Sequence, residues 1–310
     1  MTRGYHVNRR ECLKFIALAT ALGPVDLMAA VPRLKAKHLK KYPSSPTVGP
    51  KQILPPTPKV QETPLTIVMG DKDIKDYLTK VRHPNAPHTS DIVLSNYQKT
   101  LLKSVVRRFE RVRAYIGHGH FCVLGFEEAY SLAKRISRIG AFTDAERAFL
   151  EDIFWRNAAD YGFYGEKQLF KLDEKIAKKD IYKVPYTGNY LFRGEPIVKY
   201  NQIKSDLGKD LILTSGVRGL AKQFYLFLNK AYRYQGNLSL ASRSLAPPGY
   251  SYHGTGDFDV GQKGLGGMNF SADFVQTKIY SELTERGYVH YRYNKDNLLG
   301  VRYEPWHIKV

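Results

Sequence analysis

The segment "SYHGTGDFDVG", residues 251–261, places one histidine and two aspartates among three glycines. His253, Asp257 and Asp259 all carry side chains that bind metal ions, and glycines permit tight turns that gather ligands from neighbouring positions. A polar turn that merely contains a histidine has the same composition. Residues elsewhere in the sequence must distinguish a metal site from an ordinary turn.

A second group of such side chains occurs in "EPWH", residues 304–307. Glu304 and His307 are three positions apart, which in a regular strand places their side chains on opposite faces. Pro305 and the β-rich surroundings disfavour a helix. The two side chains can therefore share a site only if Pro305 marks a bulge or an edge distortion of the strand.

These residues fit the requirements of a zinc hydrolase. Such an enzyme needs three ligands drawn from His, Asp and Glu, an open fourth position for water, and a base beside that water. The C-terminal region offers such a set, with His253 and Asp259 in the first stretch and Glu304 and His307 in the second. The stretch "SGVRG", residues 215–219, adds an arginine at the end of a predicted strand.

Three motifs in this order, "SGxR", "SxH…D" and a final "ExxH", resemble the zinc D-alanyl-D-alanine carboxypeptidases of the VanY type. These belong to a wider group of metallopeptidases that includes lysostaphin-like enzymes and the Hedgehog fold. The resemblance covers roughly residues 190–310 and does not extend to residues 65–180. It implies Zn²⁺ as cofactor and the terminal D-Ala-D-Ala bond of peptidoglycan stem peptides as substrate.

The resemblance also implies a role for each matching residue. Glu304 is expected to act as the general base that takes a proton from the attacking water and passes it to the leaving amine. Arg218 is expected to stabilise the oxyanion, and Ser251 and Gln223 are expected to contact the substrate or the ligands. The zinc ligands are expected to be His253, Asp259 and His307.

One spacing departs from the family pattern. The family separates its first histidine and its aspartate by seven positions, in "HxxGxAxD", whereas His253 and Asp259 are six apart. Asp259 precedes Val-Gly as the family ligand does, so it is the predicted ligand. Asp257 remains the competing carboxylate, because two positions along an extended segment face the same side.

Residues 181–310 mix strand and helix patterns without the regular alternation of a parallel sheet. Strand patterns occur at 210–219, 288–293 and 298–308, and helix patterns at 219–234 and 270–288. This mixture predicts an α+β catalytic domain, with an antiparallel sheet and flanking helices.

Residues 65–180 are predicted to be mainly helical. Apolar side chains recur every three or four positions at 95–116, which is the spacing of one helix face. Thr143 stands three positions before Glu146, a capping-box pattern that predicts the start of a helix over 143–162. The sequence leaves the role of this region open.

Residues 1–30 are predicted to be an export signal. Arg9 and Arg10 precede a moderately apolar stretch that ends in small residues, which resembles the bacterial twin-arginine consensus. The apolar stretch is too short for a membrane span. We expect a periplasmic or otherwise exported protein with no stable membrane span after signal removal. Residues 31–64, rich in Pro and Lys, are predicted to be a basic linker.

The formal net charge of +19 favours a polyanionic partner. Export disfavours nucleic acid and favours an acidic cell-wall polymer. The sequence thus predicts an exported zinc carboxypeptidase acting on peptidoglycan stem peptides, of open oligomeric state. The alternatives are an L,D-carboxypeptidase or a peptidoglycan endopeptidase, or a non-catalytic wall-binding protein on the same fold, which the shortened spacing keeps open.

Overall fold

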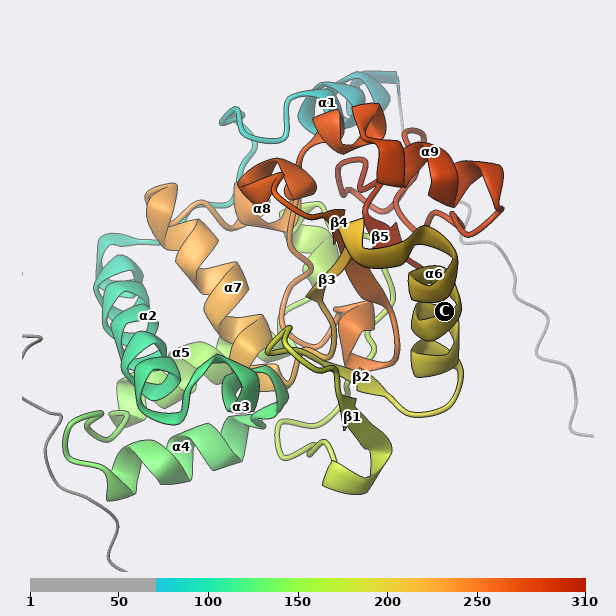
Figure 1. Ribbon diagram of the computed structural model, residues 1–310. Coiled ribbons are helices and arrows are strands. Elements are labelled where there is room, and N and C mark those ends of the chain that lie inside the picture. The colour runs from blue at the N-terminus through green and yellow to red at the C-terminus, as the bar shows by residue number, and fades with distance from the viewer. Residues whose placement is uncertain (1–70) are drawn as a thin grey trace, which may run out of the picture. The chain divides into compact units, whose positions relative to one another are not determined.

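The computed structural model describes residues 71–310 (Figure 1). The predicted export signal, 1–30, and basic linker, 31–64, lie outside the described residues. Within residues 71–310, every helix is too short or too polar to cross a membrane.

The first part of the described chain is helical, as the sequence predicted. Thr143 caps the N-terminus of α5 (Asp144–Trp155). Its side chain accepts a hydrogen bond from the Glu146 N–H, and the Glu146 side chain accepts one from the Thr143 N–H. This is the capping box expected from the sequence. The helices are α1 (Asp71–Arg82), α2 (Asn96–Ile116), α3 (His118–Val123), α4 (Phe126–Arg135) and α5 (Asp144–Trp155).

The second part contains two small antiparallel sheets and four further helices. One sheet pairs β1 (Ile181–Lys183) with β2 (Tyr190–Phe192), and the other has the order β3 (Leu211–Ser215), β4 (Phe258–Gln262), β5 (His307–Ile308). The prediction of an α+β fold with an antiparallel sheet and flanking helices is therefore confirmed. The helices are α6 (Glu195–Leu207), α7 (Leu220–Arg233), α8 (Leu238–Ser242) and α9 (Lys278–Glu285).

Helix α7 joins the two parts of the fold. Its Phe224 and Phe227 are fully buried in one hydrophobic core with Phe109 of α2 and Phe126 of α4. Figure 1 shows α7 between α2 and the strands β3 and β4. Residues 65–180 and 181–310, which the sequence analysis separated, consequently lie in one compact unit, Leu65–Val310.

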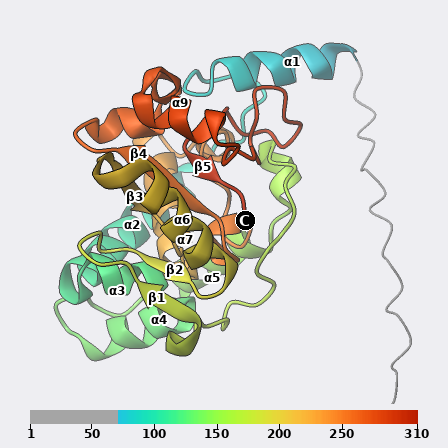
Figure 2. The same cartoon turned by 45° about the vertical axis from the view of Figure 1, so that its right-hand side comes forward.

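A second core lies under the three-stranded sheet. Phe258 of β4 and Ile308 of β5 are fully buried against Ile203 of α6 and Leu283 of α9. Figure 2 shows α6 and α9 beside this sheet. This shared core fixes the position of the strands that carry the site.

The prediction of strands at 288–293 and 298–308 is wrong, except that the end of the second range forms β5. The backbone of this segment bonds to other parts of the fold instead of forming a ladder. Gly300, at a φ of +77°, lies so close to the Gly162 carbonyl that a Cβ there would meet its oxygen at 1.8 Å. This close packing against the end of the helical region replaces strand pairing.

Candidate metal centre

Strand β4 carries the centre of the site. Asp259 lies opposite Ser215 of β3 on one side and opposite His307 of β5 on the other. His253 lies just before β4, in the 3-10 turn Tyr252–Gly254. Sheet register therefore brings together residues that are about fifty positions apart in the sequence.

His253, Asp259 and His307 form a buried cluster. Each offers a ligand atom, and these atoms all lie within 4.8 Å of one another. The Asp259 Oδ1 is 3.3 Å from His253 Nε2 and 3.1 Å from His307 Nδ1. In the part of the chain that the structure describes, this is the one group of three or more His, Cys, Asp or Glu so arranged.

The other nitrogen of each imidazole has its own partner. His253 Nδ1 is 2.9 Å from the Gly216 carbonyl oxygen, and His307 Nε2 is 2.9 Å from Asp257 Oδ2. Partners of this kind fix the orientation of a metal-binding histidine and leave its other nitrogen free to coordinate. Two histidines held in this way beside a carboxylate fit the donor set of a catalytic zinc site.

Asp257 is held on the outer side of His307. Arg292 donates hydrogen bonds to both of its oxygens, at 2.5 and 3.1 Å, and the Val310 N–H donates another at 3.1 Å. The cluster of potential ligands includes Asp259 and not Asp257. Of the two aspartates left open by the sequence, the geometry thus assigns Asp259 to the cluster and Asp257 to the support of His307.

The charges of the cluster are strongly coupled. Burial, assisted by the nearby Arg218 charge, lowers the pKa of His253 to about 4. Burial alone would lower the pKa of His307 too, but Asp257 and Asp259 outweigh it and raise that pKa to about 9. Burial opposes the ionisation of Asp259, yet His253 and Arg218 hold its pKa well below the usual range. A metal cation at this place competes with the proton of His307.

Glu304 reaches the same cleft because the chain turns at Pro305 and Trp306. The His307 N–H donates a hydrogen bond to the Glu304 carbonyl, at 3.2 Å, and β5 begins directly after this turn. The Glu304 side chain is buried, which raises its pKa to about 7 despite the opposing charge of His307. A carboxylate with a pKa near neutrality is suited to general base catalysis.

The sequence of this part of the chain matches a known protein family. Residues 198–310 match the family model of VanY, D-alanyl-D-alanine carboxypeptidase. This segment is a VanY-type domain. The resemblance predicted for residues 190–310 is confirmed, and with it the expectation of an enzyme of the carboxypeptidase-like metallopeptidase class.

No curated protein matches the chain. Solved structures give distant likenesses to about half of it. The LD-carboxypeptidase LdcB is 23% identical, with a TM-score of 0.33 over 48% of this chain and 67% of that one. The Zn(II) complex of a mutant of the vancomycin-resistance D,D-pentapeptidase VanY is 21% identical, with a TM-score of 0.35 over 47% and 86%. VanYB with D-alanine-D-alanine is 22% identical, with a TM-score of 0.35 over 46% and 82%.

Arg218 and Ser251 of the VanY-type domain lie at the cluster. Arg218 donates from Nη2 to Asp259 Oδ2, at 2.5 Å, and from Nε to the Ser215 hydroxyl, at 3.0 Å. Arg218 thus holds the outer oxygen of Asp259 while its guanidinium lines the cleft. Ser251 is buried and lines the same cleft.

Gln223 does not line the cleft. Its amide nitrogen donates to the Arg218 carbonyl, at 2.7 Å, and its amide oxygen accepts from the Gly249 N–H, at 2.9 Å. Gln223 therefore ties the Arg218 turn to the loop that leads to Ser251. Both ends of the side chain are used to position the site.

The cleft beside the cluster has a volume of about 500 Å³. It contains His253, Asp259 and His307 together with Glu304, so the predicted ligands and base face one space. The sequence analysis did not single out several other residues that line it. These are Lys222, Leu226, Lys230, Arg233, Tyr252, Tyr293 and Arg302.

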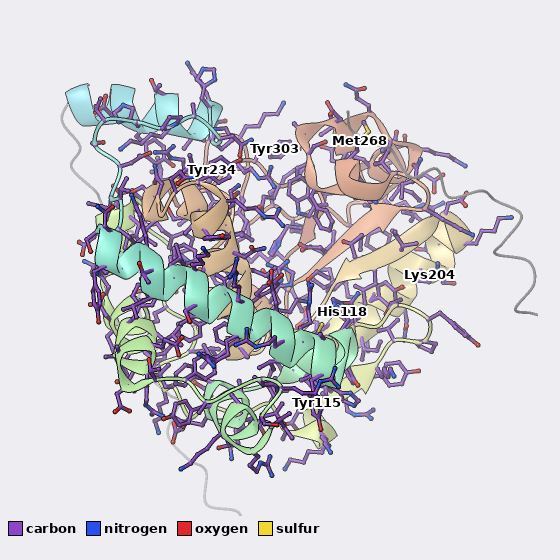
Figure 3. The ribbon with its side chains drawn as sticks, turned by 90° about the vertical axis from the view of Figure 1, so that its left-hand side faces the viewer. Tyr115, His118, Lys204, Tyr234, Met268 and Tyr303 are labelled. Carbon is purple, nitrogen blue, oxygen red and sulfur yellow. The ribbon has the colours of Figure 1, made fainter. Side chains whose placement is uncertain are left out.

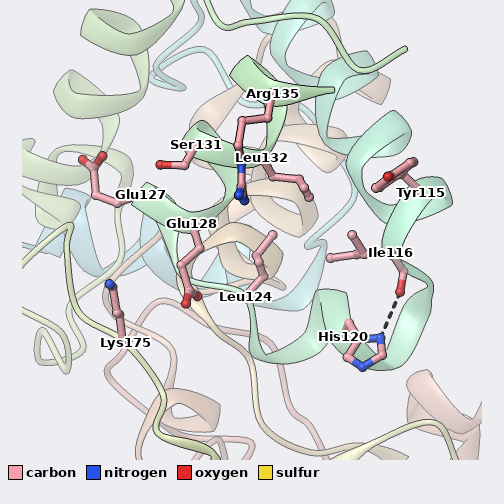
Figure 4. Close-up of a pocket in the computed structure, with 10 residues that line it drawn as sticks. All are labelled: Tyr115, Ile116, His120, Leu124, Glu127, Glu128, Ser131, Leu132, Arg135 and Lys175. Atoms are coloured by element: carbon pink, nitrogen blue, oxygen red, sulfur yellow. Dashed lines mark hydrogen bonds between the residues drawn. The ribbon is translucent and has the colours of Figure 1, made fainter. Parts of the chain in front are cut away.

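A second hollow, of about 690 Å³, lies between the end of α2, α3 and α4 (Figure 4). It contains none of the predicted site residues. His120 points into it and bonds the Ile116 carbonyl through Nδ1, at 3.1 Å. This contact is that of an ordinary histidine at a helix junction.

Proposed function

We propose that this protein is a zinc-dependent carboxypeptidase that hydrolyses the terminal D-Ala-D-Ala bond of peptidoglycan stem peptides. One observation carries the proposal. Two oriented histidines, one aspartate and a buried glutamate of raised pKa converge on a single cleft of a VanY-type domain.

His253, Asp259 and His307 are the residues that would hold the zinc. When bound, zinc supplies a Lewis acid that polarises the scissile carbonyl and lowers the pKa of water. Glu304 takes the proton of the attacking water and delivers it to the nitrogen of the departing D-alanine. The carbonyl carbon gains a bond to oxygen as its bond to nitrogen breaks, so the products are a shortened peptide and free D-alanine.

Arg218 contributes positive charge at the wall of the cleft. Its guanidinium is fixed by Asp259 and Ser215, so it needs little rearrangement when negative charge develops on the carbonyl oxygen. The same contacts hold Asp259 in the orientation that the cluster needs. Arg218 thus supports both the ligand set and the transition state.

The proposal is tested with muropeptides and metal analysis. Wild-type protein should carry one zinc and release one D-alanine from a pentapeptide stem, as followed by mass spectrometry. Glu304→Gln should keep the zinc and lose turnover, whereas His253→Ala should lose both. Cleavage of tetrapeptides alone would identify an L,D-carboxypeptidase, cleavage of cross-links an endopeptidase, and zinc without any cleavage a binding protein.

We propose further that the protein is exported to the periplasm by the twin-arginine route. The pair Arg9-Arg10 and the apolar stretch that follows support this, and the excess of basic residues suits an acidic wall polymer. Cell fractionation tests it. Replacement of both arginines by lysine should retain the protein in the cytoplasm, and unchanged export of that variant would contradict the proposal.

A further inference from the structure

The cleft continues away from the metal cluster along α7. Lys222, Leu226, Lys230 and Arg233 all line it, and their spacing of four, four and three positions places them on one face of the helix. Figure 3 shows His118, another lining residue, and Tyr234, the residue directly after α7, well apart. Helix α7 thus gives the cleft a basic wall along its length.

All three of these cations lack an ion-pair partner among the described residues, and Lys222 instead bonds the Cys122 sulfur, at 3.1 Å. The Lys230 ammonium bonds the Ser244 hydroxyl and, at 3.4 Å, the side-chain oxygen of Asn85, both of which are neutral. Among the ion pairs of residues 76–310, none includes Lys230 or Arg233. Protein cations that line a cleft without a carboxylate partner are suited to bind an anionic ligand.

Arg302 faces the same space from the segment before Glu304. Its guanidinium lies over the Trp306 ring, 5.0 Å from the ring centroid, which holds it in place. Its Nε forms an ion pair with Glu304 Oε1, at 3.8 Å, but it is buried and makes no hydrogen bond. A buried donor without an acceptor is rare in a folded protein, and a ligand oxygen would satisfy it.

The cations also repel one another. Burial, followed by the charge of Arg302, lowers the pKa of Lys230 to about 8; Glu304 opposes this shift, and Arg233 and Arg243 add to it. Arg243 is compensated by its ion pair with Asp91. Arg302 shares Glu304, so Lys230 and Arg233 are the cations that an anion at this place would compensate.

We propose that Lys230, Arg233 and Arg302 form a second anion-binding subsite, which takes a carboxylate on the acyl side of the peptide substrate. The proposal rests on the proposed function. Arg233 lies thirteen residues along α7 from Leu220, the residue after the Arg218 turn, so about 20 Å of helix separates them. The departing D-alanine spans only about 3.5 Å, so only the acyl side of the peptide can extend from Glu304, beside Arg302, as far as Arg233.

Matched peptides test the subsite. Two acylated peptides ending in D-Ala-D-Ala, identical except for Glu or Gln one or two positions upstream, are compared on the zinc-loaded full chain. Lys230→Met and Arg233→Gln should each lower kcat/KM for the Glu peptide about tenfold and leave the Gln peptide within about twofold. Lys134→Met, an exposed lysine of α4 outside the cleft, is the matched control and should change neither.

Three results would overturn the subsite. They are equal losses on both peptides, a wild type that does not distinguish them, and an effect that disappears when the C-terminal carboxylate is made an amide. The last result would assign the cations to the terminal carboxylate. If the wild type cleaves neither peptide, the proposed function fails. Calorimetric binding of the same peptides to wild type and Lys230→Met then tests the subsite alone, and equal affinities contradict it.

Discussion

Asp257 shows how one added carboxylate can support a metal site. It stands two positions before the proposed ligand Asp259, where the family pattern "HxxGxAxD" has alanine, and it holds the outer nitrogen of His307. Arg292 neutralises its charge and fixes both of its oxygens. The pair therefore orients a ligand histidine from outside the cluster.

Asp257→Asn is expected to weaken zinc binding without abolishing it. The amide keeps a hydrogen-bonding group beside His307 but removes the charge, and changes at such partners typically lower metal affinity about 10- to 100-fold. Asp259→Asn should eliminate binding under the same conditions. Chelator competition measures both affinities, with Asp296→Asn, an exposed residue, as control. The reverse ranking would show that Asp257 is the ligand.

The pKa of Glu304 predicts the acid limb of the activity profile. Burial favours the neutral acid and raises its pKa to about 7, and only the ionised form accepts a proton from water. Lowering the pH through 7 should therefore reduce kcat/KM, about tenfold per unit below the pKa. The measurement is kcat/KM against pH at saturating zinc with zinc content checked at each point. An unchanged rate down to pH 5 would exclude Glu304 as the base.

At the residue scale, the members of the cluster could be predicted from the sequence because each lies in a short motif with a recognisable neighbour. His307 and Glu304 share "EPWH", and Asp259 precedes Val-Gly. Arg292 could not be predicted in this way. It contacts Asp257 across 35 positions of sequence, and its tyrosine-rich surroundings indicated only a strand.

At the scale of elements, Gln223 shows how α7 controls the loops of the site. Its amide joins the Arg218 turn to the loop before Ser251, and it is only 2% exposed. Gln223→Ala leaves a buried carbonyl and a buried N–H without partners. We expect the free energy of unfolding to fall by about 1–3 kcal/mol, together with a lower zinc affinity.

Thermal and denaturant unfolding of Gln223→Ala, measured together with its KM, distinguish a positioning role of Gln223 from a direct substrate contact. A residue that only contacts substrate would raise KM and leave stability unchanged. Asn229→Ala, at a partly exposed position of the same helix, controls for a change in helix propensity.

The helices were easier to predict than the strands, for a physical reason. Local signals such as the capping box of Thr143 and Glu146 operate within one turn of chain. Residues 288–306 have strand-like composition but form no strand, because Gly300 packs onto Gly162 and the chain bonds to distant carbonyls. Such contacts depend on tertiary structure, which overrides strand propensity.

For the whole molecule, the shared core makes the helical region part of the catalytic fold. Phe224, Phe227 and Leu228 of α7 are fully buried in the core formed with α2, α4 and α5. Fully burying each side chain stabilises a protein by about 1.5–3 kcal/mol. Together they approach the total stability of about 5–15 kcal/mol that is typical of a domain.

A fragment comprising residues 181–310 should therefore not fold by itself, even though it contains every predicted ligand. Loss of residues 65–180 exposes the apolar face of α7, and with it the helix that holds the Arg218 turn through Gln223. Residues 65–310 should unfold cooperatively and bind zinc. Circular dichroism melting and zinc titration of the two fragments measure this. A cooperative transition and stoichiometric zinc in 181–310 would show that the helical region is an independent addition.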